Sequence, residues 1–442
     1  MQEEVYDLQL QRKYQSALGK SPKHAALLKS QLYCGNSVIH APGFDSGAFV
    51  LSNGQKAKFF GIASCDNSWS CPHCAVKQMS KYAAEIAVAL DALKARGQLA
   101  FMLTLTIPHL RFMTCEQVTE ILYNSWKVFV VRGNKNQHAG YYVKKDGQKV
   151  LKRSEAKSKD VFAAFCEEFN CKHRVRVGEY TWGKNGWHPH FHCLFWVDAD
   201  KIEKVSAWQS KISKRWLEIV RRETLKILKR AKVDADDIAR LEDYIDILYK
   251  KAKDKDKAAY ISVDKQGKII VQKSSMYICG WGADRELTGN FKRKATNEGH
   301  LTPFQLLEKA TDDPNDEWMK LYLEYAWATR VKRHARINFS VHSGIKKIIE
   351  EWKKTHVYQE VCKKKAATNP NTGLKVVCWF KEFDWWNICL LNRQIPIKAQ
   401  ILEAALMENP LEAIKNLLMK YNIQPSNRAN RDTHIVESLF VA

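Results

Sequence analysis

The stretch Trp187-His188-Pro189-His190-Phe191-His192-Cys193-Leu194-Phe195-Trp196 places three histidines on alternate positions of an apolar, aromatic run. A period of two is typical of a β-strand, in which side chains two residues apart share a face. The three histidines therefore share one face of a predicted strand, and the apolar residues between them share the other. A lone histidine on such a strand is usually a core residue, but three in a row predict metal ligands.

A second β-rich run, residues 174–182, precedes this strand, and Gly183-Lys184-Asn185-Gly186 separates the two. Asn-Gly between two such runs predicts a hairpin with a two-residue type I′ turn. This turn would pair Lys184 with Trp187 and set Glu179 opposite His192. A slip of one residue would turn Glu179 to the other face.

The predicted hairpin brings one carboxylate and several imidazoles to the same face. Two imidazoles, His190 and His192, and the carboxylate of Glu179 leave positions open for water and substrate. Such a site suits a divalent cation, Mg²⁺ or Mn²⁺, that polarises a phosphate oxygen. His188 is a third candidate imidazole, although it lies nearest the turn.

The charge of the chain points to a polyanionic partner. Its 442 residues carry a formal net charge of +23, from 71 Lys and Arg against 48 Asp and Glu. Together with 14 Trp, 16 Tyr and 18 Phe, this charge suits single-stranded nucleic acid, whose bases stack on aromatic rings while its phosphates meet cations. A solvated basic surface without a partner is the alternative.

The chain shows no apolar stretch of the length of a membrane span, and its first residues, Met1-Gln2-Glu3-Glu4, do not resemble a signal peptide. We therefore expect a cytoplasmic protein without a membrane partner. In that compartment its 12 cysteines are expected as thiols or metal ligands, not as a disulfide framework.

A cysteine cluster near the N-terminus predicts a structural zinc site. Cys71 and Cys74 form a Cys-x-x-Cys pair, which lets two thiolates take adjacent corners of a tetrahedron, and Cys34 and Cys65 can supply the others. Either of two nearby histidines, His40 or His73, could replace one of these ligands. The alternative is four reduced core cysteines.

Apolar periodicity predicts further elements. Helices are expected over 76–96, 116–131, 201–231 and 234–251. A basic hairpin is expected over 141–151, as a candidate DNA-contacting insertion or a merely solvated ribbon, and a second hairpin over 374–391.

Three motifs resemble the HUH endonucleases, in the form of rolling-circle replication initiators of small plasmids. His190-Phe191-His192 resembles the histidine-hydrophobe-histidine motif, residues 101–108 resemble the first strand motif, and residues 277–288 resemble the tyrosine motif. The plasmid initiators also carry a similar cysteine cluster. The family usually has a lysine three residues after the tyrosine, where this chain has Gly280.

The resemblance implies that Tyr277 is a nucleophile that attacks single-stranded DNA and stays bound to the 5′ phosphate. Taken alone, a tyrosine between Met276 and Ile278 is more often a core residue. Asp284 and Glu286 are the nearest acids that could activate water to resolve the intermediate. Implied partners are single-stranded or hairpin origin DNA and a host helicase with the replication machinery, and a homodimer is left open.

We therefore expect an α+β fold with an HUH-type central antiparallel sheet flanked by helices, an N-terminal zinc knuckle and a mostly helical C-terminal region. The predicted regions are an N-terminal arm (1–33), the zinc-knuckle region with the first helix (34–98), the HUH catalytic core (99–295) and a helical region with a disordered tail (296–442). The predicted function is site-specific nicking and joining of single-stranded DNA that initiates rolling-circle replication. An HUH transposase or relaxase is one alternative, a non-catalytic zinc-containing DNA-binding regulator another, and a metal-dependent hydrolase without a covalent step a third.

Overall fold

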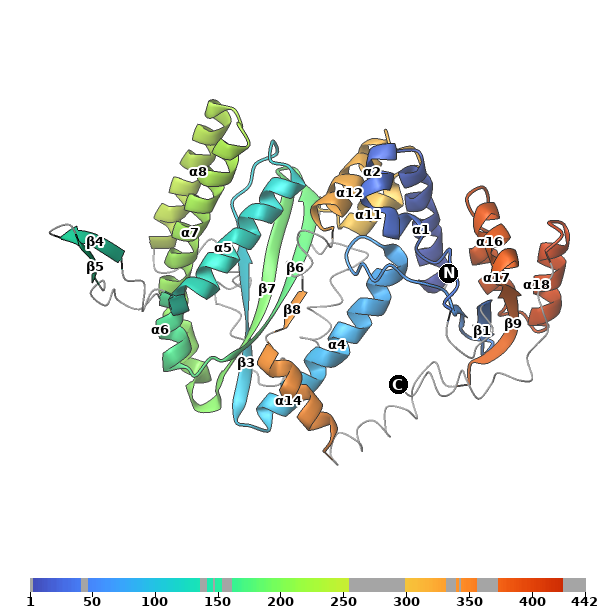
Figure 1. Cartoon of the computed structure of the whole chain (residues 1–442), viewed down its shortest axis with the longest axis horizontal. Coiled ribbons are helices and arrows are strands. Elements are labelled where there is room, and N and C mark those ends of the chain that lie inside the picture. The colour runs from blue at the N-terminus through green and yellow to red at the C-terminus, as the bar shows by residue number, and fades with distance from the viewer. Residues whose placement is uncertain are drawn as a thin grey trace. The chain divides into compact units, whose positions relative to one another are not determined.

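The computed structural model shows a mixed α+β protein in two compact units (Figure 1). It describes residues 3–40, 47–135, 141–145, 148–152, 161–253, 299–330, 339–341, 343–355 and 373–423. Unit 1 combines Met1–Ser80, Phe304–Arg330 and Lys353–Ala442, and unit 2 combines Lys81–Pro303 and Val331–Trp352. The four predicted regions are consecutive in the sequence, whereas each observed unit is assembled from separate segments.

Unit 2 is built on a four-stranded sheet in which all neighbouring strands are antiparallel. The strand order is β3 (Gln98–Thr106), β7 (Gly186–Asp198), β6 (His173–Gly183) and β8 (Phe339–Val341). The strand β7, which carries the histidine row, therefore lies inside the sheet with a partner on each side. This confirms the expected antiparallel hairpin and the α+β class.

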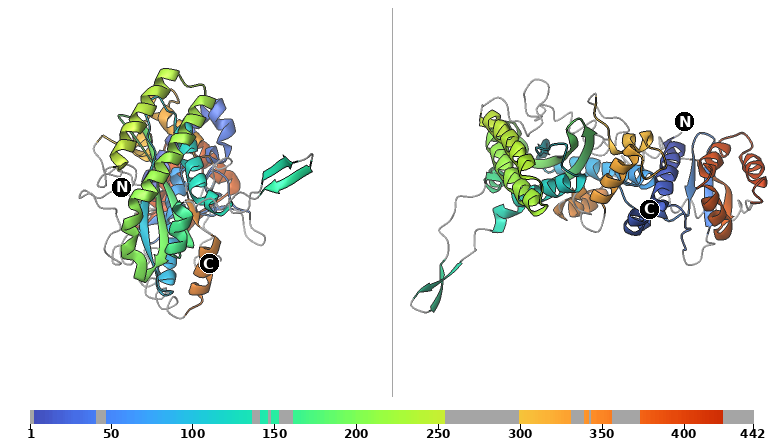
Figure 2. Two further views of the ribbon diagram at one scale, coloured as in Figure 1. Left: turned by 90° about the vertical axis from the view of Figure 1, so that its left-hand side faces the viewer. Right: turned by 90° about the horizontal axis from the view of Figure 1, so that it is seen from above.

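Helices pack on the apolar face of β7. The views of Figure 1 and Figure 2 show α5 (Cys115–Lys135) and α7 (Gln209–Arg230) beside the sheet. The ring of Trp126 in α5 lies 6.0 Å from that of Phe191 and 6.3 Å from that of Phe195. Because these phenylalanines occupy odd-numbered positions and fill the core on one face, His188, His190 and His192 at even-numbered positions must face the other way.

The remaining elements of unit 2 agree with the predicted helices and hairpin. The predicted helices 76–96, 116–131, 201–231 and 234–251 correspond to α4 (Pro72–Lys94), α5, η1 (Ala199–Trp208) with α7, and α8 (Ala235–Lys253). The unit also contains β4 (Tyr141–Lys145), β5 (Gln148–Lys152), α6 (Val161–Glu168) and α14 (Ser343–Lys353). The division between the two units falls within α4. The strands β4 and β5 pair with each other in the predicted hairpin, with Val143 opposite Val150.

Unit 1 has a three-stranded antiparallel sheet in the order β2 (Ala57–Phe60), β1 (Gly47–Ser52) and β9 (Lys375–Lys381). Its helices are α1 (Glu3–Gly19), α2 (Pro22–Leu27), α3 (Lys29–Leu32), α11 (Pro303–Lys309), α12 (Glu317–Ala328), α16 (Glu382–Leu391), α17 (Ile397–Ala404) and α18 (Pro410–Met419). Buried side chains from the first 60 residues and from β9 to α18 share one core. The two ends of the described chain therefore fold together.

The predicted hairpin over 374–391 is wrong in its second half. The first half is the strand β9, but it pairs with β1, and the second half is the helix α16. The buried residues of α16, Trp385, Ile388 and Cys389, are three and four residues apart, which is the spacing of one helix face. The tryptophans concealed this period, because aromatic residues are also common in strands.

Candidate functional site

The metal row predicted from the sequence lies on the face of β7 opposite to Phe191 and Phe195. Glu179 in β6 is directly opposite His190, and His192 lies two residues farther along the same strand. Side chains at these positions point to one face of the sheet. The side chains of Glu179, His190 and His192 are 17%, 13% and 12% exposed, so the group is shielded but still reached by solvent.

The predicted register of this hairpin is wrong by two residues. Gly183 pairs with Gly186, so the loop consists of Lys184 and Asn185, and Glu179 faces His190 instead of His192. In this turn only Gly186 has a positive φ, 87°, which excludes the predicted type I′ turn because that turn needs positive φ at both loop residues. Because the error is an even number of residues, Glu179 stays on the histidine face.

The ligand atoms of Glu179, His190 and His192 converge closely enough to hold one metal ion. The Oε2 atom of Glu179 lies 3.1 Å from Nε2 of His190 and 2.9 Å from Nε2 of His192, and the two Nε2 atoms are 3.1 Å apart. Two ligands about 2.1 Å from an ion and at right angles to each other are about 3.0 Å apart. The three atoms therefore fit one face of an octahedron and leave the other three positions open.

The charge of this group favours a cation. Burial acts to raise the pKa of Glu179, but hydrogen bonds and charge from His190 and His192 outweigh it, so the pKa lies below its ordinary value. The carboxylate is therefore ionised at neutral pH. An anionic oxygen beside two imidazole nitrogens is a ligand set for a divalent ion such as Mn²⁺ or Mg²⁺.

A hydrogen bond from outside the group holds one of these rings. The hydroxyl of Thr104 in β3 lies 3.0 Å from Nδ1 of His192, on the far side of the ring from Glu179. Hydrogen bonds of this kind fix the orientation and tautomer of a histidine that binds metal. Thr104 lies within the stretch 101–108 that the sequence indicates as a strand, but its contact with His192 depends on the pairing of β3 with β7, which no sequence pattern predicted.

His188 shares the face but does not belong to the ligand group. Its Nδ1 atom lies 2.6 Å from Nε2 of His109, and the ring of His300 packs against it at 6.3 Å between centroids. Burial, followed by the charges of His190, His109 and His300, lowers the pKa of His188 to about 3. Neither His109 nor His300 lies in a recognisable motif, so no sequence pattern predicted their place beside His188.

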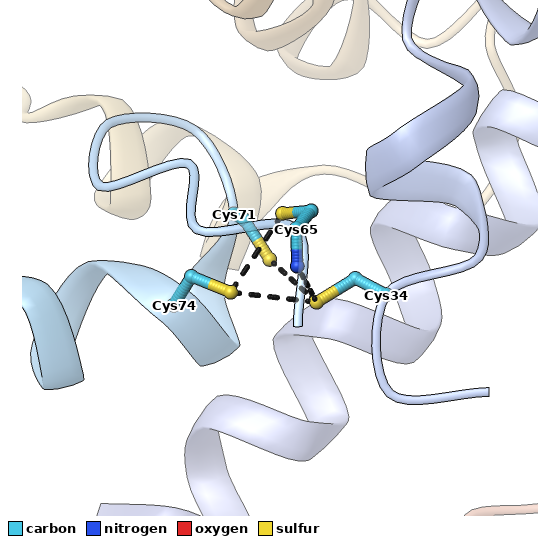
Figure 3. Close-up of side chains that lie close together, drawn as sticks. All are labelled: Cys34, Cys65, Cys71 and Cys74. Carbon is cyan, nitrogen blue, oxygen red and sulfur yellow. Dashed lines mark hydrogen bonds between the residues drawn. The ribbon is translucent and has the colours of Figure 1, made fainter. Parts of the chain in front are cut away.

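The structure brings the four predicted cysteine ligands together in unit 1 (Figure 3). The Sγ atom of Cys34 lies 3.4 Å from that of Cys74 and 3.6 Å from that of Cys71, and the Sγ atoms of Cys65 and Cys74 are 3.7 Å apart. Four sulfurs about 2.3 Å from a tetrahedral zinc ion are about 3.8 Å apart. The spacing fits a closed Cys₄ site, and the group includes no histidine.

The thiols of this group cannot all ionise without a cation. Burial, with hydrogen bonds from the other thiols, raises the pKa of Cys71, whereas hydrogen bonds from Cys34, Cys65 and Cys71 lower the pKa of Cys74. One thiolate is thus stabilised by its neighbours while another is suppressed. A bound zinc ion offsets this repulsion, because zinc takes cysteine as thiolate.

Long-range hydrogen bonds hold the cysteine loops in place. The side-chain amides of Gln11 and Gln15 in α1 each donate to the carbonyl of Cys34 at 2.9 Å. From α12, the hydroxyls of Tyr322 and Tyr325 donate to the carbonyls of Ser70 and Trp69, just before Cys71. The N-terminal arm therefore has a role that the sequence did not disclose: it anchors the cysteine site.

The third predicted motif lies outside the described residues. Tyr277, Gly280, Asp284 and Glu286 fall within residues 254–298, which the structure does not describe. The chain resumes at Gly299, and Leu301 then exchanges two backbone hydrogen bonds of 2.8 Å with Trp182 near the end of β6. The described part of the site therefore consists of the metal group and its histidine neighbours.

Among the described residues, no helix is long and apolar enough to cross a membrane. Comparison of the chain with protein-family models, with curated proteins and with solved structures finds no match.

Proposed function

We propose that this protein nicks and rejoins single-stranded DNA at a specific site and thereby starts rolling-circle replication. The observation that carries the proposal is the group formed by Glu179, His190 and His192 on the histidine face of strands β6 and β7. Three protein ligands on one side of an ion leave positions for phosphate oxygens and water. A site of this kind suits the transfer of a phosphodiester.

In the proposed reaction the oxygen of Tyr277 attacks the scissile phosphorus. A bond from Tyr277 to phosphorus forms, the bond from phosphorus to the 3′ oxygen breaks, and the 3′ oxygen leaves as a hydroxyl after gaining a proton. A divalent ion, when bound, polarises the phosphate and offsets the developing negative charge. The energy of the phosphodiester is kept in the protein–DNA bond, so the reverse reaction joins strands.

Three further features support this proposal. The net charge of +23 suits a nucleic-acid substrate. The carboxylate of Glu179 is ionised and lies beside two imidazole nitrogens, so this group favours the binding of a cation over that of an anion. Gly299 follows Tyr277 by 22 residues in the sequence, and Leu301 is bonded to β6 beside the histidine row, so the intervening chain is long enough for Tyr277 to reach the metal group.

Covalent capture of DNA tests the proposal. The full chain is incubated with a labelled single-stranded DNA library and Mn²⁺ or Mg²⁺, and a denaturing gel then shows whether label migrates with the protein. We expect an adduct that chelator prevents and that Tyr277→Phe eliminates. The matched control His24→Ala, a histidine of α2 in unit 1, should form the adduct normally. An adduct undiminished in Tyr277→Phe would contradict the proposed nucleophile.

A non-catalytic zinc-containing DNA-binding regulator is the second candidate, and the Cys₄ group is the observation that favours it. A regulator would need neither Glu179 nor Tyr277. DNA binding that persists without any adduct, at every cation tested, would favour this candidate. A transposase or relaxase would form the same adduct but would act at transposon ends or at a transfer origin, so the sequence of the captured DNA separates these alternatives.

A further inference from the structure

A chain of hydrogen bonds leads from the hairpin turn to the histidine row. Nδ1 of His109, in the loop after β3, lies 3.2 Å from the backbone carbonyl of Asn185 in the turn. Its other nitrogen, Nε2, lies 2.6 Å from Nδ1 of His188. The two rings meet edge to face with 4.8 Å between their centroids. His109 therefore connects the turn to the first histidine of the row.

The direction of these hydrogen bonds is fixed by the carbonyl at one end. A carbonyl oxygen only accepts, so Nδ1 of His109 must carry the hydrogen and donate it to Asn185. Burial lowers the pKa of His109, and a neutral imidazole has one hydrogen only, so its Nε2 is an acceptor. Nδ1 of His188 must then donate to it. In a neutral His188 the other ring nitrogen, Nε2, then has a lone pair and no hydrogen.

This tautomer matters because of where His188 lies. Its ring is 5.5 Å from that of His190, on the same face of β7, yet His188 is not part of the group whose ligand atoms converge. It lies too far from the others to be a direct fourth ligand. A water bound to an ion at the group, however, would donate a hydrogen to an acceptor one hydrogen bond away.

We propose that His109 and His188 form a relay that holds one metal-bound water, with His188 accepting a hydrogen from that water and His109 positioning His188 in the accepting tautomer. The proposal rests on the cation site of the proposed function and extends it by a fourth, water-mediated protein contact. Histidines that contact metal sites are held in this way by a partner on their other ring nitrogen.

The relay differs from a purely structural role in a measurable way. If His109 only tied the turn to the loop after β3, its loss would lower stability and leave the metal site unchanged. If it positions His188, its loss should weaken metal binding, and only as far as the loss of His188 itself does. When two residues act through one contact, the effects of their substitutions on the free energy of binding do not add.

The test is Mn²⁺ binding to the full chain, measured by calorimetry without DNA. His109→Phe and His188→Phe keep the ring but remove the hydrogen bonds, and each should weaken Mn²⁺ binding by about tenfold, as loss of such supporting contacts does. The double variant should be no weaker than His188→Phe. The matched control His173→Phe, on β6 at the other end of the same sheet, should bind Mn²⁺ like the wild type. Water proton relaxation of bound Mn²⁺ should also change in both single variants.

Thermal unfolding separates the outcomes. His109→Phe that melts lower but binds Mn²⁺ like the wild type would overturn the relay and leave a structural tie. If that variant does not fold, His109→Gln, whose amide can still donate and accept, serves in its place and should bind within a few fold of the wild type, whereas His188→Phe remains weak. Wild-type protein that binds no Mn²⁺ would reject the cation site and, with it, both the relay and the proposed function.

Discussion

The two candidate metal groups among the described residues are opposites in construction. The Cys₄ group in unit 1 joins the sulfurs of Cys34, Cys65, Cys71 and Cys74, the last of them in the first turn of α4, at tetrahedral spacing, and three of the four are buried. The group in unit 2 joins three atoms on one face of a sheet, with solvent reaching each side chain. An ion whose coordination positions are all filled by protein ligands can only stabilise the fold. An ion with positions left open can also bind water or substrate. The difference predicts opposite consequences of losing each ion.

The largest effect is expected from Cys74→Ser. Loss of this ligand should remove zinc and lower the melting temperature by about 10 °C or more, because the binding energy of a structural zinc ion is folding energy. Elemental analysis and circular dichroism measure the two quantities. Cys166→Ser in unit 2 is the control and should retain zinc. If Cys74→Ser protein lacks zinc but melts like the wild type, the Cys₄ group is not a structural site and does not differ from the group in unit 2 in this respect.

The double substitution His190→Ala with His192→Ala should abolish activity while leaving the stability of the fold almost unchanged. We expect Mn²⁺ binding to weaken by at least about 100-fold, because two of three ligands are lost, and the DNA adduct to disappear. The melting temperature should fall by only about 3 °C or less, since these polar side chains are not part of the apolar core and solvent reaches each of them. Calorimetry and thermal melting check both. A variant that unfolds instead would show that the open group is also structural.

The closed site should also depend on its surroundings. The buried amine of Lys398 in α17 donates to the carbonyl of Gly35 at 2.8 Å and to Oδ1 of Asn36 at 2.9 Å, directly after Cys34. Lys398→Met keeps the chain length but loses both bonds, which should cost about 2 kcal/mol and speed zinc removal by chelator. The exposed Lys415→Met should change neither. Equal rates of zinc loss in both variants would contradict this.

The smallest effect is expected at the open site. Thr104→Val removes the hydroxyl beside Nδ1 of His192 while keeping the size of the side chain. Mn²⁺ affinity should fall by about tenfold or less, because the ring keeps its other contacts. Calorimetric titration of Mn²⁺ measures the change. An unchanged affinity would show that strand geometry alone orients His192.

Local patterns predicted the parts of the site that depend on local geometry. Alternation placed His190 and His192 on one face, and Cys-x-x-Cys spacing predicted two corners of the Cys₄ group. The exact partner of Glu179 could not be read, because the loop of a hairpin depends on the conformation of each turn residue. Because the register was wrong by two residues, Glu179 stayed on the same face as the histidines. The face on which a side chain lies is therefore easier to predict than its exact partner.

Sequence patterns did not predict contacts between residues that are far apart in the chain. Nothing in residues 374–391 indicates that β9 pairs with β1, because strand partners so far apart leave no local signal. The same holds for His109 and for Gln11, which act on residues 79 and 23 positions away. Tyr277, Asp284 and Glu286 lie outside the described residues, so the role of Tyr277 stays a prediction from the resemblance, and the roles of the two acids stay predictions from their place in the sequence.

The pairing of β1 with β9 joins two strands that are synthesised at very different times. Ser52 lies opposite Lys375, so β1 leaves the ribosome roughly 320 residues before its partner, a wait of about 15–60 s at ordinary elongation rates. The cysteine ligands, all within the first 74 residues, emerge early as well. All four cysteines are therefore synthesised well before β9, the strand that completes the sheet of unit 1.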